Sequence, residues 1–551
     1  MKRRRKRKSR IIWITAIIIL IIVLGIIFGV NRTKNNNSHV LNEPLNGDLS
    51  TEDLSQTFDT YSLEVANNTQ QGLLSRTKSG NPKAGLAKSW KRSSDGLTWT
   101  FHLRKNLKWS NGDPITALDF VYNWRRTIKP ETASQYAYMY SGIKNADEIN
   151  SGRNKNLNSL GISAPNKTTV VVTLSHPIPK FENLMSSSFF FAQDRKIASK
   201  LGKKIGTSSK NQVYSGPYKL VDWNGSNKDF KLRPNKHYWN KKAVKNSGVD
   251  YQVIADPTPL LSAYKKGKLD RADLTTPQQI KKYKHNKHFF KVSTSGTDYF
   301  NYNITGKVPA LKNLKIRQAL NMATNRNNIA KNVTGGLNTP AVSLTPKGLA
   351  KTPSGKDFAK AASQETDYKY NLSEAKKLFA KGMKESGQKK LNLTIKASSD
   401  NPTAKPILDT VQQDWNKLPG LTAKEQLIPL KQRIQDTQNN NFQVSLANWG
   451  GDYAEPLTFL NMFDSDLPNN DGHWIDKSYN RLIHKASDTD ALNNQKRTHD
   501  EIEAEKLLFQ KAPIDPIDYT NLGQLRNPQV KSFEHFNSGA AYYYWMAKVN
   551  R

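Results

Sequence analysis

Two serine-containing motifs in this sequence have the residue types needed for acyl transfer. Ser262 and Lys265 have the Ser-x-x-Lys spacing, and residues 399–401 read Ser-Asp-Asn. In serine acyltransferases with these motifs a Lys-Thr-Gly or Lys-Ser-Gly triplet follows them. The only such triplet here, at residues 78–80, precedes both. Metalloprotease, nucleophile-elbow, phosphate-loop and Rossmann glycine motifs do not occur. We therefore expect no enzyme and no catalytic residue.

Residue types that bind metals are scattered along the chain. His285 and His288 are flanked by lysines rather than carboxylates, so we interpret this segment as a solvated polar helix. Asp464 and Asp466 begin like a calcium loop, but Pro468 occupies the next ligand position. The absence of cysteine excludes disulfides, thiolate metal sites and lipid attachment through cysteine. We expect no metal and no cofactor.

The chain is strongly basic, with 84 Lys and Arg against 46 Asp and Glu, a net charge of +38 over 551 residues. Such an excess is typical of nucleic-acid-binding proteins. Here the basic residues are dispersed and no module of stacking aromatic residues is visible, so we expect no nucleic-acid partner. With 36% hydrophobic residues the chain is apolar enough to fold.

The first residues predict a membrane anchor. Residues 1–10 carry eight Lys or Arg, and residues 11–30 then contain no charge. Twenty apolar residues span a bilayer, and the preceding basic cluster keeps the N-terminus in the cytoplasm. We therefore predict a single-pass protein of the cell membrane, with a flexible tether at 31–46 and an extracellular remainder.

Strand and helix signals alternate along this remainder. Alternating residues from Leu97 to Leu103 predict a strand, and Thr116 to Asp119 fit a capping box that begins a helix. Further strands are predicted around residues 170–174 and 442–446, a hairpin at residues 218–232, and a helix at residues 407–418. The fold class is therefore mixed α/β with several sheets.

Four groups of residues resemble the large peptide-binding proteins of ABC transporters. The longest is the run Asp-Gly-Leu-Thr-Trp-Thr-Phe-His-Leu-Arg that begins at residue 95 and continues through Trp109 to Phe120. The others follow in the family's order and extend the resemblance over roughly residues 55 to 545: Ser-Gly-Pro-Tyr at 215–218 with Tyr-Trp-Asn at 238–240, Ile-Arg-Gln-Ala-Leu at 316–320 with Arg326, and Trp-Gly-Gly-Asp-Tyr-Ala-Glu-Pro at 449–456.

The resemblance implies a two-lobed clamp of the periplasmic-binding-protein type that closes on a ligand without breaking a bond. It implies a monomeric receptor for oligopeptides that hands its ligand to a permease and an ATPase subunit of an ABC transporter. Lobe 1 would contain a discontinuous domain I and a domain II, and lobe 2 a domain III. Their expected boundaries are 47–70 with 195–295 and 520–551 for domain I, 71–194 for domain II and 296–519 for domain III.

The resemblance also implies ligand-binding residues. A receptor for peptides of any sequence must bind their main chain and termini. Asp452 matches the family's acidic residue in Trp-x-x-Asp-Tyr and would pair with the α-ammonium group, whereas the same residue without this match would be interpreted as a turn or cap. Its neighbours Trp449, Gly451 and Tyr453 are expected at the ligand.

Three more residues are expected to contact the ligand from other segments. Tyr136 matches a ligand-contacting tyrosine of the opposing lobe, and Gly296 and Thr297 would present backbone where the chain passes between the lobes. The alternative for Tyr136 is an aromatic residue of a surface loop, and that for Trp449 an aromatic packed at a strand end.

Two departures from the family pattern leave alternatives open. Relatives are often anchored through an N-terminal cysteine, which the helix at residues 11–30 replaces here. Some relatives hold the peptide carboxylate with arginines just before the Trp-x-x-Asp motif, but residues 443–448 contain no basic residue, so no residue is assigned to the C-terminus. The same fold could serve a sensor of signalling or wall peptides or a receptor for another solute, and a surface hydrolase or adhesin is the remaining class.

Overall fold

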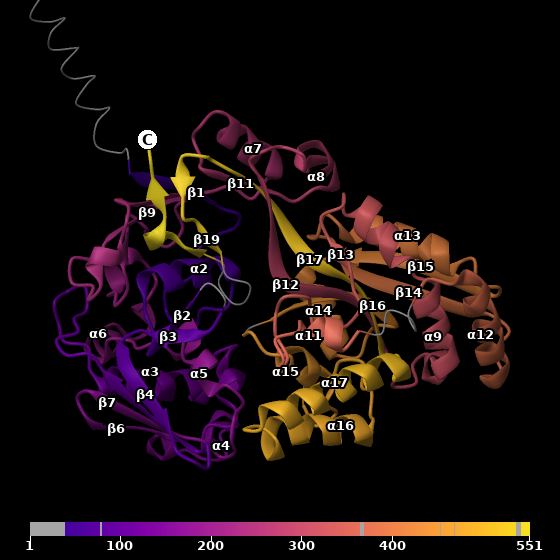
Figure 1. Cartoon of the computed structure of the whole chain (residues 1–551), viewed down its shortest axis with the longest axis horizontal. Helices are drawn as coiled ribbons and strands as arrows, with labels where there is room; N and C mark the ends of the chain where they lie inside the picture. The colour runs from indigo at the N-terminus through magenta and orange to yellow at the C-terminus, as the bar shows by residue number, and fades with distance from the viewer. Residues whose placement is uncertain (1–38, 78–79, 364–368, 452, 468, 536–541) are drawn as a thin grey trace, which may run out of the picture.

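In a computed structural model the chain forms two lobes that lie side by side and are joined by long strands at one end (Figure 1). The structure describes residues 39–77, 80–363, 369–451, 453–467, 469–535 and 542–551. Lobe 1 contains the N-terminal and C-terminal parts of the chain, and lobe 2 contains most of the second half.

Lobe 1 is built on two four-stranded sheets. One has the order β1-β10-β9-β8, formed by Val40–Leu45, Gly248–Val253, Asp229–Pro234 and Tyr218–Val221. The other has the order β4-β5-β7-β6, formed by Ala87–Arg92, Thr98–Leu103, Thr169–Thr173 and Ile162–Asn166. The helices of this lobe are α2 (Thr60–Thr69), α3 (Ala117–Ile128), α4 (Ala146–Asn150), α5 (Phe181–Leu184) and α6 (Arg195–Leu201), and its short strand pairs are β2-β3 (Leu74–Arg76, Pro82–Ala84), β18-β21 (Val530–Lys531, Lys548–Val549) and β19-β20 (Glu534–His535, Tyr542–Tyr543).

Lobe 2 is built on one seven-stranded sheet with the order β11-β17-β12-β16-β14-β15 and β13 beside β17. Its strands are Arg271–Leu274 (β11), Phe289–Tyr302 (β12), Thr339–Pro340 (β13), Leu391–Ser398 (β14), Leu421–Ile428 (β15), Val444–Gly450 (β16) and Ile514–Arg526 (β17). β14 pairs in parallel with both β15 and β16, and parallel neighbours need a crossover connection. Helix α13 (Ala404–Trp415) and helix α14 (Leu430–Gln438) supply these crossovers.

Helices cover both faces of this sheet. Helices α9 (Leu314–Ala323), α12 (Leu372–Glu385) and α13 share one core with Phe300 and Tyr302 of β12. Helices α15 (Leu457–Leu460), α16 (Lys477–His484) and α17 (Asn494–Lys511) share the other core with Tyr299. This alternation along β12 is that of a strand buried on both faces. The remaining helices are α7 (Pro257–Lys265), α8 (Pro277–Tyr283), α10 (Arg326–Asn328) and α11 (Phe358–Ala361).

Most elements predicted from periodicity are confirmed. β5 and β7 pair at the predicted places, and β8 pairs with β9 as the predicted hairpin. The capping box at Thr116 begins α3, with the Thr116 backbone N–H donating to the Asp119 carboxylate at 2.7 Å. The predicted helix at residues 407–418 is α13, which ends at Trp415.

The flexible tether predicted over residues 31–46 is wrong at its end. Val40–Leu45 form β1, which pairs in parallel with β10, and Leu41 and Leu45 are buried. The buried Glu43 of this strand accepts a hydrogen bond from Arg271 Nε at 2.8 Å. Polar residues dominate the average composition of residues 31–46, but a short apolar run is enough for a buried strand, and all of Val40–Leu45 except one residue is buried.

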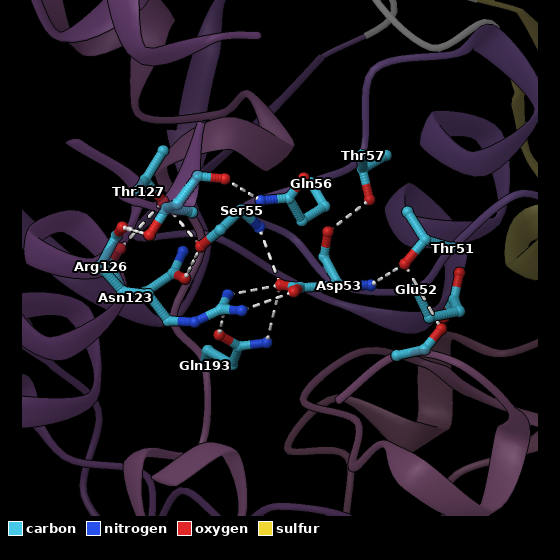
Figure 2. A network of polar contacts seen from close by, with 12 residues as sticks. Thr51, Glu52, Asp53, Ser55, Gln56, Thr57, Asn123, Arg126, Thr127 and Gln193 are labelled. Atoms are coloured by element: carbon cyan, nitrogen blue, oxygen red, sulfur yellow. Dashed lines mark hydrogen bonds and ion pairs between the residues drawn. The ribbon is translucent and has the colours of Figure 1, made fainter. Parts of the chain in front are cut away.

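A polar network fixes the N-terminal segment of lobe 1 to α3 (Figure 2). Arg126 donates from Nη1 and Nη2 to the two carboxylate oxygens of Asp53, each at 2.6 Å. Gln193 Nε2 donates to Asp53 Oδ1 at 3.4 Å. A bidentate guanidinium–carboxylate pair holds its partners in a defined orientation. The network therefore connects the segments at 47–70 and 71–194, which the sequence assigns to different domains.

The structure does not test two expectations about the organisation of the chain. Within the part of the chain that the structure describes, no helix is long and apolar enough to cross a membrane, and the span predicted at residues 11–30 lies outside that part. The expected domain boundaries stay an interpretation. β12 crosses the expected boundary at 295/296 and β17 crosses the one at 519/520, so both connections between the lobes run through long strands.

Candidate functional site

The strand β16 has a free edge. On one side it pairs with β12 from Val444 to Gly450. On the other side β14 pairs only with Val444 and Ser445. From Leu446 to Gly450, therefore, no strand among the described residues pairs with this edge. Unpaired backbone N–H and C=O groups along a strand are a template for pairing with another extended chain.

A cavity of about 580 Å³ lies beside this free edge. Its size is within the range of sites that bind small ligands. It is lined by Leu446, Ala447 and Asn448 of β16, by the loop at 398–403 after β14, and by residues of α8, α14, β12 and β17. Its polar side chains include Asp298, Asn338, Asp400, Arg433, Asn448 and Asn521, and its apolar ones Leu274, Ile280, Leu337, Leu430 and Leu522.

Arg433 brings a guanidinium group to this cavity from α14. Its Nε donates to Ser398 Oγ at 2.9 Å and its Nη1 to Ser445 Oγ at 3.4 Å. Burial lowers the pKa of Arg433, with Tyr299 and Asp471 acting in the opposite direction. Among the described residues no carboxylate forms an ion pair with it within 4.0 Å. A guanidinium has five N–H donors, so this one retains donors for an anionic group.

Two buried carboxyl groups lie opposite each other on β12 and β17. Asp298 and Asp518 are direct partners in the strand register and are 4% and 0% exposed. Asn448 Nδ2 donates to Asp298 Oδ1 at 2.7 Å, and Asn338 Nδ2 donates to Asp518 Oδ1 at 3.0 Å. Burial raises the pKa of Asp298 to about 6, and burial together with the neighbouring Asp298 raises the pKa of Asp518 well above its ordinary value. Two adjacent carboxyl groups in such a site share a proton at neutral pH.

The structure places Trp449 on the face of the sheet opposite Asp298. Its indole Nε1 donates to the carbonyl of Thr458 at 2.9 Å, and its ring is partly buried against the core that contains α15. Gly451 donates its N–H to the carbonyl of Ser295 at 3.0 Å, and a Cβ at this position would lie 3.1 Å from Leu349. The prediction for Asp452 lies outside the described residues.

Tyr453 of lobe 2 and Tyr136 of lobe 1 both pack against the core of lobe 1. Both are partly buried against the same core, which is formed by residues of lobe 1 between Leu73 and Ala192. The ring of Tyr136 stacks on Phe189, with centroids 3.8 Å apart. Neither tyrosine lines the cavity beside β16. Their contact with a ligand stays a prediction.

Gly296 and Thr297 lie inside the sheet. Both pair with β16 on one side and with β17 on the other. The Thr297 side chain is fully buried, and its hydroxyl donates to the carbonyl of Leu344 at 2.7 Å. β16 rather than β12 therefore offers backbone groups at a free edge, and a ligand contact by Gly296 or Thr297 stays a prediction.

The two lobes touch directly after β16. Lys180 of lobe 1 forms an ion pair with the buried Glu455 of lobe 2. Arg497 Nη2 lies 3.7 Å from the same carboxylate, and Arg497 Nε lies 3.6 Å from Glu501. Burial raises the pKa of Glu455, and burial together with Glu455 raises the pKa of Glu501 to about 8. The chain thus passes from the free edge of β16 into the contact between the lobes within five residues.

The sequence did not indicate Arg433 or the Asp298–Asp518 pair as site residues. Arg433 precedes Trp449 by 16 residues, and its place beside Ser445 follows from the crossover through α14. Asp298 and Asp518 are 220 residues apart. One signal in the sequence could have indicated this pair: each aspartate lies within a stretch whose other residues predict a buried strand. A buried ionisable residue needs a partner, so two such aspartates are candidates for a site.

A two-lobed α/β fold with long connecting strands and a cavity at a free strand edge defines a solute-binding protein. The family model for the middle part of the bacterial extracellular solute-binding proteins, family 5, matches residues 81–471. The chain therefore belongs to family 5 of the bacterial extracellular solute-binding proteins, and like the members of this family it is a binding protein and not an enzyme. The expected α/β fold of the periplasmic-binding-protein type is therefore confirmed.

Individual relatives extend the similarity over nearly the whole chain. A dipeptide-binding protein of Lactococcus lactis subsp. cremoris (strain MG1363) is 39% identical over 548 residues, which cover 97% of this chain and 98% of that protein. The substrate-binding domain of an oligopeptide ABC transporter from Bacillus anthracis str. Ames has a TM-score of 0.79 at 31% identity, covering 94% of this chain and 99% of that one. Listeria monocytogenes OppA bound to peptide has a TM-score of 0.78 at 31% identity, covering 93% and 99%.

Proposed function

We propose that this protein is a receptor for short peptides. The observation that carries the proposal is the free edge of β16 from Leu446 to Gly450 with a cavity of about 580 Å³ beside it. An extended peptide can add to such an edge through main-chain hydrogen bonds while its side chains enter neighbouring pockets. The names of the Lactococcus and Listeria relatives, a dipeptide-binding protein and a protein bound to peptide, support the same ligand class.

The proposal assigns one charged residue to each end of the peptide. Asp452 would pair with the α-ammonium group. Arg433 would bind the terminal carboxylate at the other end of the exposed edge, since it lies beside Ser445 and lacks a carboxylate partner among the described residues. Charged termini that are desolvated on closure need such partners.

The proposed receptor is anchored by residues 11–30 with its lobes outside the cell, and it delivers its peptide to the permease of an ABC transporter that ATPase subunits drive. The sequence supports the anchor, since residues 11–30 are free of charge and follow eight basic residues. The Bacillus anthracis relative, named as the substrate-binding domain of an oligopeptide ABC transporter, supports the transport role.

Calorimetric titration of the full chain with one peptide in three forms tests this proposal. The three forms are the free peptide, the N-acetylated peptide and the C-terminally amidated peptide. We expect the free peptide to bind, and acetylation and amidation each to weaken binding tenfold or more. A loss of this size is expected when a buried charge loses its partner. Asp452→Asn should weaken the free peptide but remove the effect of acetylation, and Arg433→Gln should remove the effect of amidation.

Each variant is the control for the other, because each should respond to the modification at the opposite end. If acetylated and free peptides bind the wild type equally, the role of Asp452 is wrong. If the wild type binds no short peptide in any form, the proposed function itself is wrong.

A further inference from the structure

The Asp298–Asp518 pair lacks a cationic partner within the described part of the chain. No Lys, Arg or His there lies within 4.0 Å of either carboxyl group. Asp518 Oδ2 is buried and, apart from the proton that the two carboxyl groups share, has no hydrogen-bond partner in the described residues. The amides of Asn448 and Asn338 satisfy only one oxygen of each group. A buried carboxylate without a compensating cation is costly, and such a group persists in a binding site when a ligand supplies the missing charge.

The pair is accessible from the cavity beside β16. Asp298 and both amides, Asn338 and Asn448, line this cavity, and Asp518 lies beside Asp298 as its partner on the neighbouring strand β17. Leu337 and Leu522 line the same cavity. The cavity therefore combines an apolar wall with a buried negative charge. A lysine or arginine side chain complements both features, because its aliphatic stem can pack on the apolar wall and its cationic end can pair with the negative charge.

The other charged groups around the cavity do not neutralise the pair. Lys291 of β12 acts on Asp518 from a distance, but its ammonium donates to Thr339 Oγ1 at 3.3 Å and forms no ion pair within the described residues. Arg433 is held by Ser398 and Ser445 on the far side of β16.

Asp400 is the other carboxylate that lines this cavity, and its Oδ2 accepts the N–H of Leu430 at 2.8 Å. It is exposed, so water screens its charge more strongly than that of the buried pair. The buried pair is therefore the negative charge that a desolvated cation would meet.

We infer that Asp298 and Asp518 form a subsite for a cationic side chain of the bound peptide, a lysine or an arginine. This inference rests on the proposed function and adds a ligand preference to it. The excess positive charge of the whole chain would favour acidic peptides, but charges farther away than about 8–10 Å are largely screened at physiological salt. The buried pair therefore decides which side chain the cavity accepts.

The position of this side chain follows from the strand register. Asn448, which holds Asp298, precedes residue 452 by four residues. A peptide paired with β16 advances by about 3.3 Å per residue, as the strand does. With its α-ammonium at Asp452, the peptide would place a residue three to five positions from its N-terminus at the subsite.

A peptide scan on the full chain tests the inference. Pentapeptides with a free N-terminus carry lysine at one of positions 2 to 5 and are compared with the same peptides carrying norleucine. At one of positions 3 to 5 we expect lysine to bind about tenfold tighter than norleucine or more. Because the pair holds a proton at neutral pH, binding of the lysine peptide should also release a proton, measured as a dependence of the binding enthalpy on the buffer.

Asp298→Asn should reduce the lysine preference to about threefold or less, a loss of most of the charged contact, while norleucine peptides keep their affinity and show that the variant is folded. Asp400→Asn is the matched control, because it removes a carboxylate from the same cavity and should leave the preference unchanged. Equal binding of lysine and norleucine peptides at every position would overturn the inference and leave the proposed function intact. Loss of the preference in both variants would also overturn it, and binding of no peptide would overturn both proposals.

Discussion

Asp298 and Asp518 make the stability of lobe 2 depend on pH in an unusual direction. Burial raises the pKa of Asp298 from 3.8 to about 6, so the folded chain binds more protons at this site than the unfolded chain between these values. Stability falls with rising pH wherever the folded state binds more protons. Without a ligand, Asp298 therefore destabilises the protein progressively as the pH rises from about 4 through 6, the window between its ordinary pKa and its raised pKa in the folded protein.

We predict that Asp298→Asn stabilises the ligand-free protein at pH 8 by about 1–3 kcal/mol and leaves its stability at pH 4 nearly unchanged. The urea midpoint of the lobe 2 transition at both pH values measures this. Asp515→Asn, on the neighbouring strand β17, is the control. The buried Asp515 forms an ion pair with Arg326, so its loss leaves a buried cation unpaired and should destabilise the protein at pH 8. A wild type more stable than Asp298→Asn at pH 8 would contradict the assignment.

The strand β16 is the element that turns a sheet into a binding surface. β14 follows it for only two residues and then turns into the loop that precedes α13, which leaves Leu446–Gly450 without a partner on that side. A short pairing of this kind is normally a liability, because an exposed strand edge invites pairing with other chains. Here the edge borders a cavity and ends close to the contact between the lobes.

Methylation of peptide nitrogens tests whether β16 pairs with the ligand. Each N-methyl group removes one main-chain donor, and its effect should alternate along the peptide, because successive N–H groups of an extended chain point to opposite sides. We predict a loss of about fivefold or more at every second position, from the loss of a hydrogen bond and the methyl clash, and a small effect between them. Competition against a fluorescent peptide measures the series. A uniform effect at all positions would contradict strand addition.

The elements around this site were largely predictable from the sequence, but their arrangement was not. Period-two and helical spacing are local signals, and they located β5, α3 and α13 and the beginning of β16. The free edge of β16 depends on where β14 turns away, and the approach of Arg433 to Ser445 depends on the path of α14. Both are properties of tertiary packing, to which periodicity is insensitive.

At the scale of the whole molecule, a small number of contacts hold the lobes together. Leu492 of lobe 2 lies against the turn at Gly96 of lobe 1, where a Cβ would come within 2.8 Å of it. Tyr453 packs on the core of lobe 1. The ion pair between Lys180 and Glu455 adds an electrostatic contact. Glu455 and Glu501 are each 2% exposed, and Arg497 is the only other cation of the described residues within 4.0 Å of them. Separation of the lobes would remove Lys180 and leave the carboxyl groups of Glu455 and Glu501 with the guanidinium group of Arg497 alone among the described cations.

We predict that Lys180→Met shifts the ligand-free protein toward an open form and weakens peptide binding roughly tenfold, because a smaller closed population lowers apparent affinity in proportion.

The distance between two spin labels, one on each lobe, measures this shift. The chain has no cysteine, so Lys155→Cys and Ile475→Cys, both at exposed positions, provide the two attachment sites. Lys405→Met, which removes two ion pairs at the surface of lobe 2, those with Asp409 and Glu425, is the matched control. The effect of Lys180→Met should shrink as the pH falls, because Glu455, whose pKa burial raises, is then protonated and needs no cation. An unchanged distance distribution in Lys180→Met would mean that apolar contacts alone keep the lobes closed.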